Sequence, residues 1–131
     1  MSENINSTRR EQLLLGWRDP EYRAAFVDQH VNNSIAFQTR SNREQRGWLQ
    51  EDLAKRLGKY QSWVSVLENP NYGKHSLGTL KAIARVFDCV LEVRFRPFSY
   101  LLDYLSSRSS GDLVAVSFDE DNFALKRDDS D

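Results

Sequence analysis

The stretch QEDLAKRLGKYQSWVSVLEN, residues 50–69, contains two short helical patterns separated by a glycine. Apolar residues recur at the spacing of a buried helix face in both halves: Leu53, Ala54 and Leu57 in the first, Val64 and Leu67 in the second. Gly58 is typical of a helix end. The pattern therefore predicts a helix from Gln50 to Leu57, a three-residue turn and a second helix from Gln61 to Glu68.

The particular residues of this stretch resemble the Cro/repressor-type (XRE-like) helix-turn-helix family of transcriptional regulators. The shared features are Gln50, Leu53-Ala54, the turn glycine, Gln61-Ser62 and the closing Leu67-Glu68-Asn69. The resemblance spans about residues 34–90, and the segments ENPNYGK (68–74) and VRFRPFS (93–99) are similar to a subgroup of small bacterial or phage regulators. It implies a mainly α, lambda-repressor-like DNA-binding domain, and double-stranded DNA as the partner.

The second helix presents its polar residues together. At 100° per residue, positions 61, 62, 65 and 66 lie on one side, opposite Val64 and Leu67. Gln61 can make a bidentate contact with adenine, and Val66 can touch a thymine methyl. We therefore expect base contacts from this side: Gln61, Ser62, Ser65 and Val66. Helix capping is the plainer alternative for Gln61 and Ser62.

The resemblance also implies contacts with the DNA backbone. It assigns Gln50 a phosphate contact and a brace for the amide of Gln61, and a helix N-terminus favours phosphate on its own account. The expected phosphate contacts are Gln50, Lys59, Tyr60, Asn69, Lys74 and Arg43, with Arg40 beside them. For Lys59 and Tyr60, simple solvation is an equal alternative. Trp63 lies next to Leu67, so we expect packing rather than base stacking.

Upstream, Asp19-Pro20-Glu21 is a helix start, with a capping Asp and a Pro suited to the first helical position. The pattern leaves open whether this helix breaks near residues 31–34 or continues to Arg46 before Gly47 ends it. Residues 1–11 carry few core-forming side chains, and we expect them to be disordered or loosely attached. Thr39 and Asn42 depart from the aliphatic residues that the family carries there, which suggests that this helix is shifted or packs against something else, such as a helix at 19–31.

Downstream, Ser76 is placed to cap a helix from Leu77 to Phe87. Alternation then predicts a strand at 90–95, a short helix at 98–105, a linker at 106–111 and a possible second strand at 113–118. The first strand can pair with its copy across a two-fold axis or with the second strand of its own chain. The dimerisation candidates are Leu91, Val93, Phe95 and Phe98.

Charge is distributed unevenly although the net charge is only -1. Residues 34–96 hold 11 basic and 6 acidic side chains, net +5, whereas residues 97–131 hold 3 basic and 8 acidic, net -5. Local rather than total charge attracts phosphates, so the basic module suits DNA; ordinary solvated faces are the plain alternative.

Several kinds of chemistry have no signal in the sequence. The chain has one cysteine, Cys89, and two separate histidines, His30 and His75, which do not suggest a metal site, and we expect no cofactor. No nucleophile motif or phosphate-cradling glycine loop occurs, so an enzyme is not expected. The polar N-terminus lacks the apolar core of a signal peptide, which favours a cytoplasmic location.

These observations divide the chain into an N-terminal arm (1–18), a helix-turn-helix domain with a helical extension (19–96), a C-terminal extension (97–118) and an acidic tail (119–131). The resulting hypothesis is a dimeric repressor that reads operator half-sites with residues 61–69. The alternative is an antitoxin whose acidic tail covers a basic toxin while the protein represses its own operon.

Overall fold

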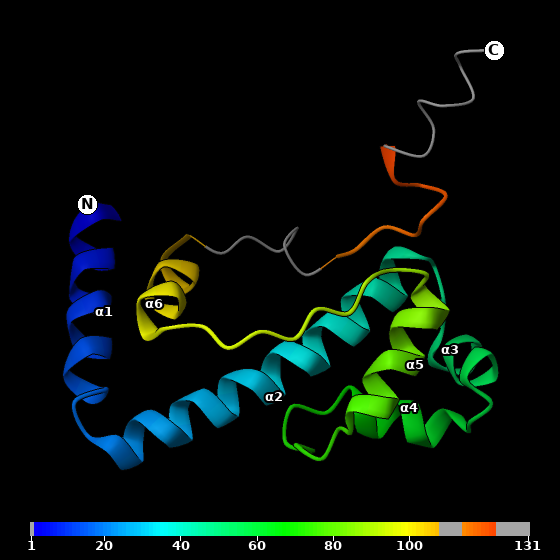
Figure 1. Ribbon diagram of the computed structural model, residues 1–131, viewed down its shortest axis with the longest axis horizontal. Helices are drawn as coiled ribbons and strands as arrows, with labels where there is room; N and C mark the ends of the chain where they lie inside the picture. Colours follow the sequence, from blue (N-terminus) through cyan, green and yellow to red (C-terminus); the bar gives the residue numbers. More distant parts are fainter. Residues whose placement is uncertain (1, 108–113, 123–131) are drawn as a thin grey trace.

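A computed structural model describes residues 2–107 and 114–122, which form six α-helices and no strand (Figure 1). The helices are α1 (Ser2–Gly16), α2 (Pro20–Gln45), α3 (Gln50–Leu57), α4 (Gln61–Leu67), α5 (Leu77–Phe87) and α6 (Phe98–Ser107). The long α2 runs across the molecule. The helices α1 and α6 lie at its N-terminal half, and α3, α4 and α5 gather at its C-terminal end (Figure 1).

The structure resolves the open question about α2, which is one uninterrupted helix from Pro20 to Gln45. Its predicted start is confirmed, because the Oδ1 atom of Asp19 accepts the backbone N–H of Glu21 at 3.1 Å. Gly47 follows the helix end with a φ of 72°, a left-handed conformation that glycine adopts without steric cost.

The two polar residues that depart from the family pattern are both buried in α2. Thr39 and Asn42 donate side-chain hydrogen bonds to the carbonyl oxygens of Ile35 and Gln38, each one turn earlier and each at 2.8 Å. This satisfies their polar groups inside the helix. The 19–31 segment is continuous with this part of α2 and therefore does not pack against it as a separate helix.

The main core lies among α3, α4 and α5. Its buried members are Leu53, Ala54, Val64, Leu67, Ile83 and Phe87, with Trp48, Leu57, Trp63, Tyr72, Val86 and Cys89 packed around them. Leu53 and Val64 are fully buried at 0% exposure, as the helical periodicity predicts. The expected packing role of Trp63 is confirmed. The predicted cap of α5 is also confirmed, because Ser76 Oγ accepts the backbone N–H of Thr79 at 3.1 Å.

A second, smaller cluster joins α1, α2 and α6. The ring of Trp17 lies edge-on to Phe26 and Phe98, with centroids 5.5 and 5.2 Å apart. Arg23 donates to the carbonyl oxygen of Trp17 at 2.8 Å. Of the two expectations for residues 1–11, disorder or loose attachment, the first is wrong for residues 2–11, which are helical as part of α1. The helix is anchored at its C-terminal end by Trp17, and the side chains of residues 8–12 are exposed.

The predicted strands are not formed. Residues 90–95 are extended but unpaired, and Val90, Val93 and Phe95 are 88%, 68% and 105% exposed. A strand requires a hydrogen-bonded neighbour, and alternation alone does not supply one. Residues 114–118 of the second predicted strand are hydrogen-bonded to Asn42, Arg46 and Asp88 and not to residues 90–95. Leu113 lies outside the described residues.

The observed bounds of α6 differ from the predicted ones at the C-terminal end of the helix. The short helix predicted at 98–105 is present and extends to Ser107, so Ser106 and Ser107 are helical rather than linker. Ser106 Oγ donates to the carbonyl oxygen of Leu102 at 2.8 Å, which satisfies its hydroxyl within the helix. The rest of the predicted linker, 108–111, and the tail from 123 onward lie outside the described residues.

Candidate nucleic-acid interface

The turn between α3 and α4 is built as the sequence predicts. Gly58 ends α3 with a φ of 69°, and the backbone N–H of Lys59 donates to the carbonyl oxygen of Ala54 at 2.8 Å. Asp52 accepts the backbone N–H of Leu49 at 2.8 Å, which satisfies a free donor at the start of α3. The first bond closes the turn that leads into α4, and the second caps the other end of α3.

The helix α4 buries one side and presents the other to solvent. Val64 and Leu67 are 0% and 1% exposed, whereas the four predicted base-contact residues are all exposed: Gln61, Ser62, Ser65 and Val66. The N-cap residue of α4 is Tyr60, not Gln61 or Ser62. The polar side chains are therefore presented to solvent together on a helix whose opposite face is anchored in the core.

A chain of hydrogen bonds leads from Gln61 into the protein. The Nε2 atom of Gln61 donates to Oε1 of Gln50 at 2.6 Å, and Nε2 of Gln50 donates to Oε1 of Glu68 at 3.3 Å. The brace between Gln50 and Gln61 that the family resemblance implies is thus present. It orients an exposed amide through a partly buried one, so Gln61 does not rotate freely.

The inner end of this chain is an ion pair between Arg43 and Glu68. Arg43 donates from Nε and one terminal nitrogen to the two carboxylate oxygens of Glu68, at 2.7 and 2.9 Å, and to the carbonyl oxygen of Trp48 at 2.8 Å. The two side chains are only 10% and 4% exposed. The hydrogen bond to Glu68 raises the pKa of Arg43 above its usual value.

This geometry corrects the assignment of Arg43 as a phosphate contact. Its guanidinium is buried and is engaged by Glu68 and Trp48, because α2 turns it towards the core and not towards solvent. No local sequence pattern indicates this pairing, since the partners are 25 residues apart. Arg43 is instead connected to the candidate interface indirectly, because it pairs with Glu68, which accepts a hydrogen bond from Gln50.

The other predicted phosphate contacts lie at the surface around α4. Lys59, Tyr60, Asn69 and Lys74 are exposed, and Gln50 is half-buried. The Nζ atom of Lys59 lies 5.4 Å from the ring centre of Trp63, a cation–π contact that places the ammonium beside α4. Asn69 also shapes the loop after α4, because its Oδ1 accepts the backbone N–H of Asn71 at 2.9 Å.

The loop 69–76 is fastened to α2 and to the end of α4 by contacts that sequence reasoning missed. Gln29 donates to the carbonyl oxygen of Pro70 at 3.4 Å, and His75 Nε2 lies 3.2 Å from the carbonyl oxygen of Leu67. Gly73 has a φ of 65°, a left-handed conformation that favours glycine, and a Cβ atom there would lie 2.8 Å from the side-chain amide nitrogen of Asn32 in α2. The dense turn residues signalled a loop but not where it docks.

Arg46 and Asn42 hold the C-terminal segment against the domain. One nitrogen of Arg46 donates to the carbonyl oxygens of Phe87 and Ala115, at 2.7 and 2.8 Å, and Asn42 Oδ1 accepts the backbone N–H of Ala115 at 2.8 Å. The backbone N–H of Phe118 donates to the backbone carbonyl oxygen of Asp88 at 3.0 Å. The buried Asn42 is therefore a docking point for residues 114–118.

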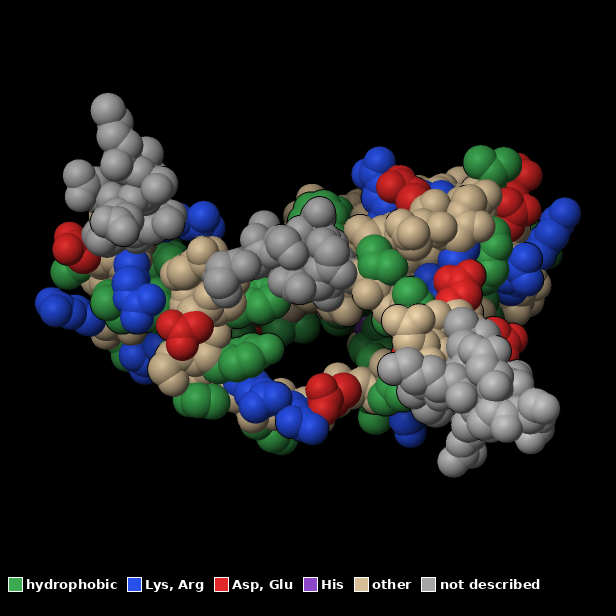
Figure 2. Space-filling view, turned by 90° about the horizontal axis from the view of Figure 1, so that it is seen from above, with side chains coloured by type: hydrophobic (Ala, Val, Ile, Leu, Met, Phe, Trp, Pro, Cys, Tyr) green, Lys and Arg blue, Asp and Glu red, His purple; other side chains and the backbone are tan. Residues whose placement is uncertain are grey.

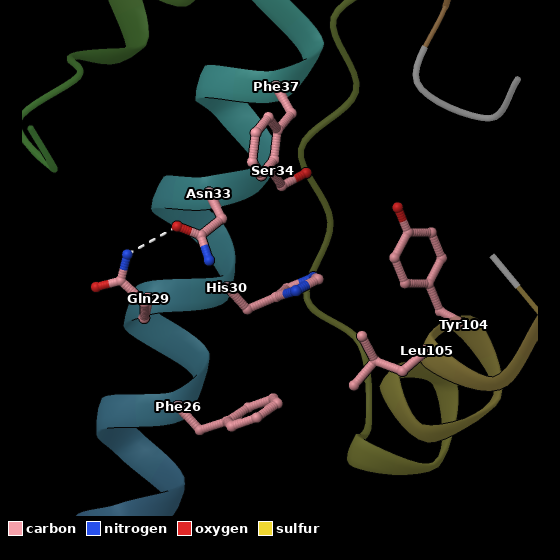
Figure 3. A pocket seen from close by; sticks show the side chains of 8 residues that line it. All are labelled: Phe26, Gln29, His30, Asn33, Ser34, Phe37, Tyr104 and Leu105. Carbon is pink, nitrogen blue, oxygen red and sulfur yellow. Dashed lines mark hydrogen bonds between the residues drawn. The ribbon is translucent and has the colours of Figure 1, made fainter. Parts of the chain in front are cut away.

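A cavity of about 280 Å³ lies outside this unit, between α2 and α6 (Figure 3). Its walls are formed by Phe26, Gln29, His30, Asn33, Ser34, Phe37, Tyr104 and Leu105. Gln29 donates to Asn33 at 2.8 Å along one wall, and the rings of His30 and Tyr104 lie edge-on with centroids 5.8 Å apart. Neither α3 nor α4 contributes to it.

The described part of the chain shows no sign of metal or membrane chemistry. No group of three or more metal-ligating side chains occurs there, and no helix there is long and apolar enough to cross a membrane. Cys89 packs against the main core, half-buried, as expected for a structural cysteine. Burial raises the pKa of its thiol.

The two helices, their left-handed glycine turn and the exposed polar face of α4 define a helix-turn-helix DNA-binding domain. Residues 40–92, somewhat under half of the chain, match the family model described as Helix-turn-helix, and this match supports a Cro/repressor-type helix-turn-helix regulator. No curated protein and no solved structure gave a significant match. Residues 1–39 and 93–131 lie outside the family match.

Proposed function

We propose that the protein is a dimeric repressor that recognises operator half-sites with α4. The observation that carries the proposal is the braced amide of Gln61, exposed beside Ser62, Ser65 and Val66 on one face of a helix anchored by the core. A fixed amide suits the paired donor and acceptor of adenine in the major groove. A helix held in this way enters the groove as a rigid unit.

The surroundings of α4 supply the charge that DNA binding needs. Lys59 and Lys74 are exposed, and Tyr60 and Asn69 border the same helix. In this proposal these residues, with Gln50, contact phosphates and fix the register, while the face of α4 reads bases. One such module makes few base contacts, so useful affinity requires two half-sites bound by two copies.

An antitoxin is the second candidate. The observation that favours it is the exposed acidic run Asp119, Glu120 and Asp121, which follows the segment held by Arg46 and Asn42. Such a run suits a basic partner surface. This role is compatible with operator binding, because it uses a different part of the chain.

Selection from a random duplex library tests the proposal. The full chain should enrich one motif with two half-sites whose centres are about 10–10.5 base pairs apart, or a multiple of that spacing. The control is a variant with alanine at 61, 62 and 65, whose exposed substitutions leave the core intact and should not enrich that motif. Recovery of unselected sequences by the unaltered chain would refute base-specific recognition.

A further inference from the structure

The segment from Val90 to Arg96, here called the strap, connects α5 to α6 as an extended chain. It runs along α2, and the space-filling view shows an opening between it and the rest of the molecule (Figures 1 and 2). Leu91 is half-buried, but Val93 and Phe95 are 68% and 105% exposed. An exposed apolar row of this kind, on an extended chain, is a surface that normally has a partner.

The backbone of the strap has no partner within the described residues. The hydrogen bonds of the connecting segments include Cys89 and Tyr100 on either side, but none to a backbone group of residues 90–96. The segment 114–118, which the sequence offered as a neighbouring strand, is instead bonded to Asn42, Arg46 and Asp88. The strap therefore has the unpaired donors and acceptors of an edge strand.

The ends of the strap limit any pairing to a short ribbon. Asp88 closes α5 in a left-handed conformation with a φ of 56°, and Pro97 has no N–H to donate. The stretch between them that can form a ladder is 90–96, and its middle residue is Val93.

Antiparallel pairing of two such segments about Val93 produces a self-complementary arrangement. In this register the numbers of two facing residues add up to 186. Glu92 of one copy therefore faces Arg94 of the other, and the two-fold axis produces this pair twice. The opposite face of the ribbon brings Leu91 against Phe95 of the other copy and places the two Val93 side chains together. Opposite charges and apolar pairs directly across a ladder stabilise it, and like charges destabilise it.

We propose that two copies of this chain associate by antiparallel pairing of their straps, in the register centred on Val93. The charge pattern favours a second copy of the chain as the partner, because a strap that carries both Glu92 and Arg94 on one face is complementary to itself. In the single chain Glu92 and Arg94 form an exposed ion pair with each other, so both charges already lie on one side of the strap. The inference supplies the dimer contact that the proposed repressor requires.

Charge reversal tests the register. We expect the full chain to sediment as a dimer without DNA, and Glu92→Arg or Arg94→Glu to place like charges opposite each other at two positions. Each variant alone should dissociate about ten-fold or more readily. A mixture of the two variants restores opposite charges at both positions, so it should form heterodimers, which a tag on one variant makes visible. An ion pair that acts only within one chain would not produce this rescue.

Matched controls carry the same charge changes on exposed helices. Glu51→Arg and Lys81→Glu lie outside the strap and should leave the dimer unchanged. Circular dichroism should show the same helix content for all variants, because the strap is extended and exposed. A monomeric unaltered chain, variants that remain equally dimeric, or a mixture that gives no heterodimer would each overturn the pairing. If the duplex-library selection nevertheless enriches a motif, the proposed DNA recognition is supported and only the proposed strap pairing is refuted.

Discussion

The side-chain amide of Gln61 donates a 2.6 Å hydrogen bond to Oε1 of Gln50, joining the first residue of α4 to the first residue of α3 across the glycine turn. Because Gln50 is itself bonded to the buried Glu68, the exposed amide is connected to an ion pair inside the domain. The orientation of the group that we expect to read a base is thus set by residues that DNA need not touch.

Gln61→Ala should relax base preference at one position of each half-site. Loss of a bidentate contact removes about 1–3 kcal/mol of discrimination there. Binding to the selected operator and to its single-base variants, measured by fluorescence anisotropy, checks this. Unchanged discrimination at every position would show that α4 is not oriented as proposed.

Lys74→Ala should weaken binding to all duplexes alike. A lysine that contacts phosphate releases a counterion on binding, so its loss should reduce the slope of log affinity against log salt by about 1 per copy. Titrations at several salt concentrations measure the slope. The comparison variant is Lys81→Ala, which removes from α5 an exposed charge that is not among the proposed phosphate contacts and should leave the slope unaltered.

Removing one partner of the Arg43–Glu68 pair should destabilise the domain more than removing both. Arg43→Met leaves the carboxylate of Glu68, which is 4% exposed, without its main partner, and a change of this kind typically costs about 3–5 kcal/mol. The double variant Arg43→Met with Glu68→Met leaves no unpaired charge and should recover part of the loss. Urea unfolding of the two single variants and the double variant gives the coupling. Additive losses would mean that the ion pair is not a structural unit.

Arg46→Met should release the segment 114–118. It removes donors to the carbonyl oxygens of Phe87 and Ala115, while methionine retains some of the packing against Phe87. The amides of Ala115 and Phe118 should then exchange faster with deuterium, whereas those of α3 should not. Arg40→Met, which breaks only the exposed pair with Glu44, serves as the control. Equal protection in both variants would contradict this account of Arg46.

Cys89 should react slowly with thiol reagents in the folded protein. Burial raises the pKa of its thiol, so less of the reactive thiolate is present at a given pH. The alkylation rate should therefore rise at higher pH than it does for the same chain in denaturant. Coincident rate profiles would show that Cys89 is as accessible as in the unfolded chain.

The sequence by itself determined the features that depend on neighbours within a few residues. Asp19 and Ser76 as caps, Gly58 at the turn and the inward faces of α3, α4 and α5 follow from local hydrogen bonding and helical period. The exposed face of α4 follows from the same period. These features were enough to predict a helix-turn-helix domain and the residues that it exposes.

Only the tertiary structure decided the contacts between distant residues. Arg43 pairs with Glu68 and not with solvent, and Asn42 and Arg46 hold Ala115, which is 73 and 69 residues away along the chain. The strap is a further example, because its alternating pattern predicted a strand but the described part of the chain provides no hydrogen-bonded neighbour for it. A helix satisfies its backbone within one segment, whereas ion pairs, docked segments and strands are completed by groups whose position no local pattern specifies.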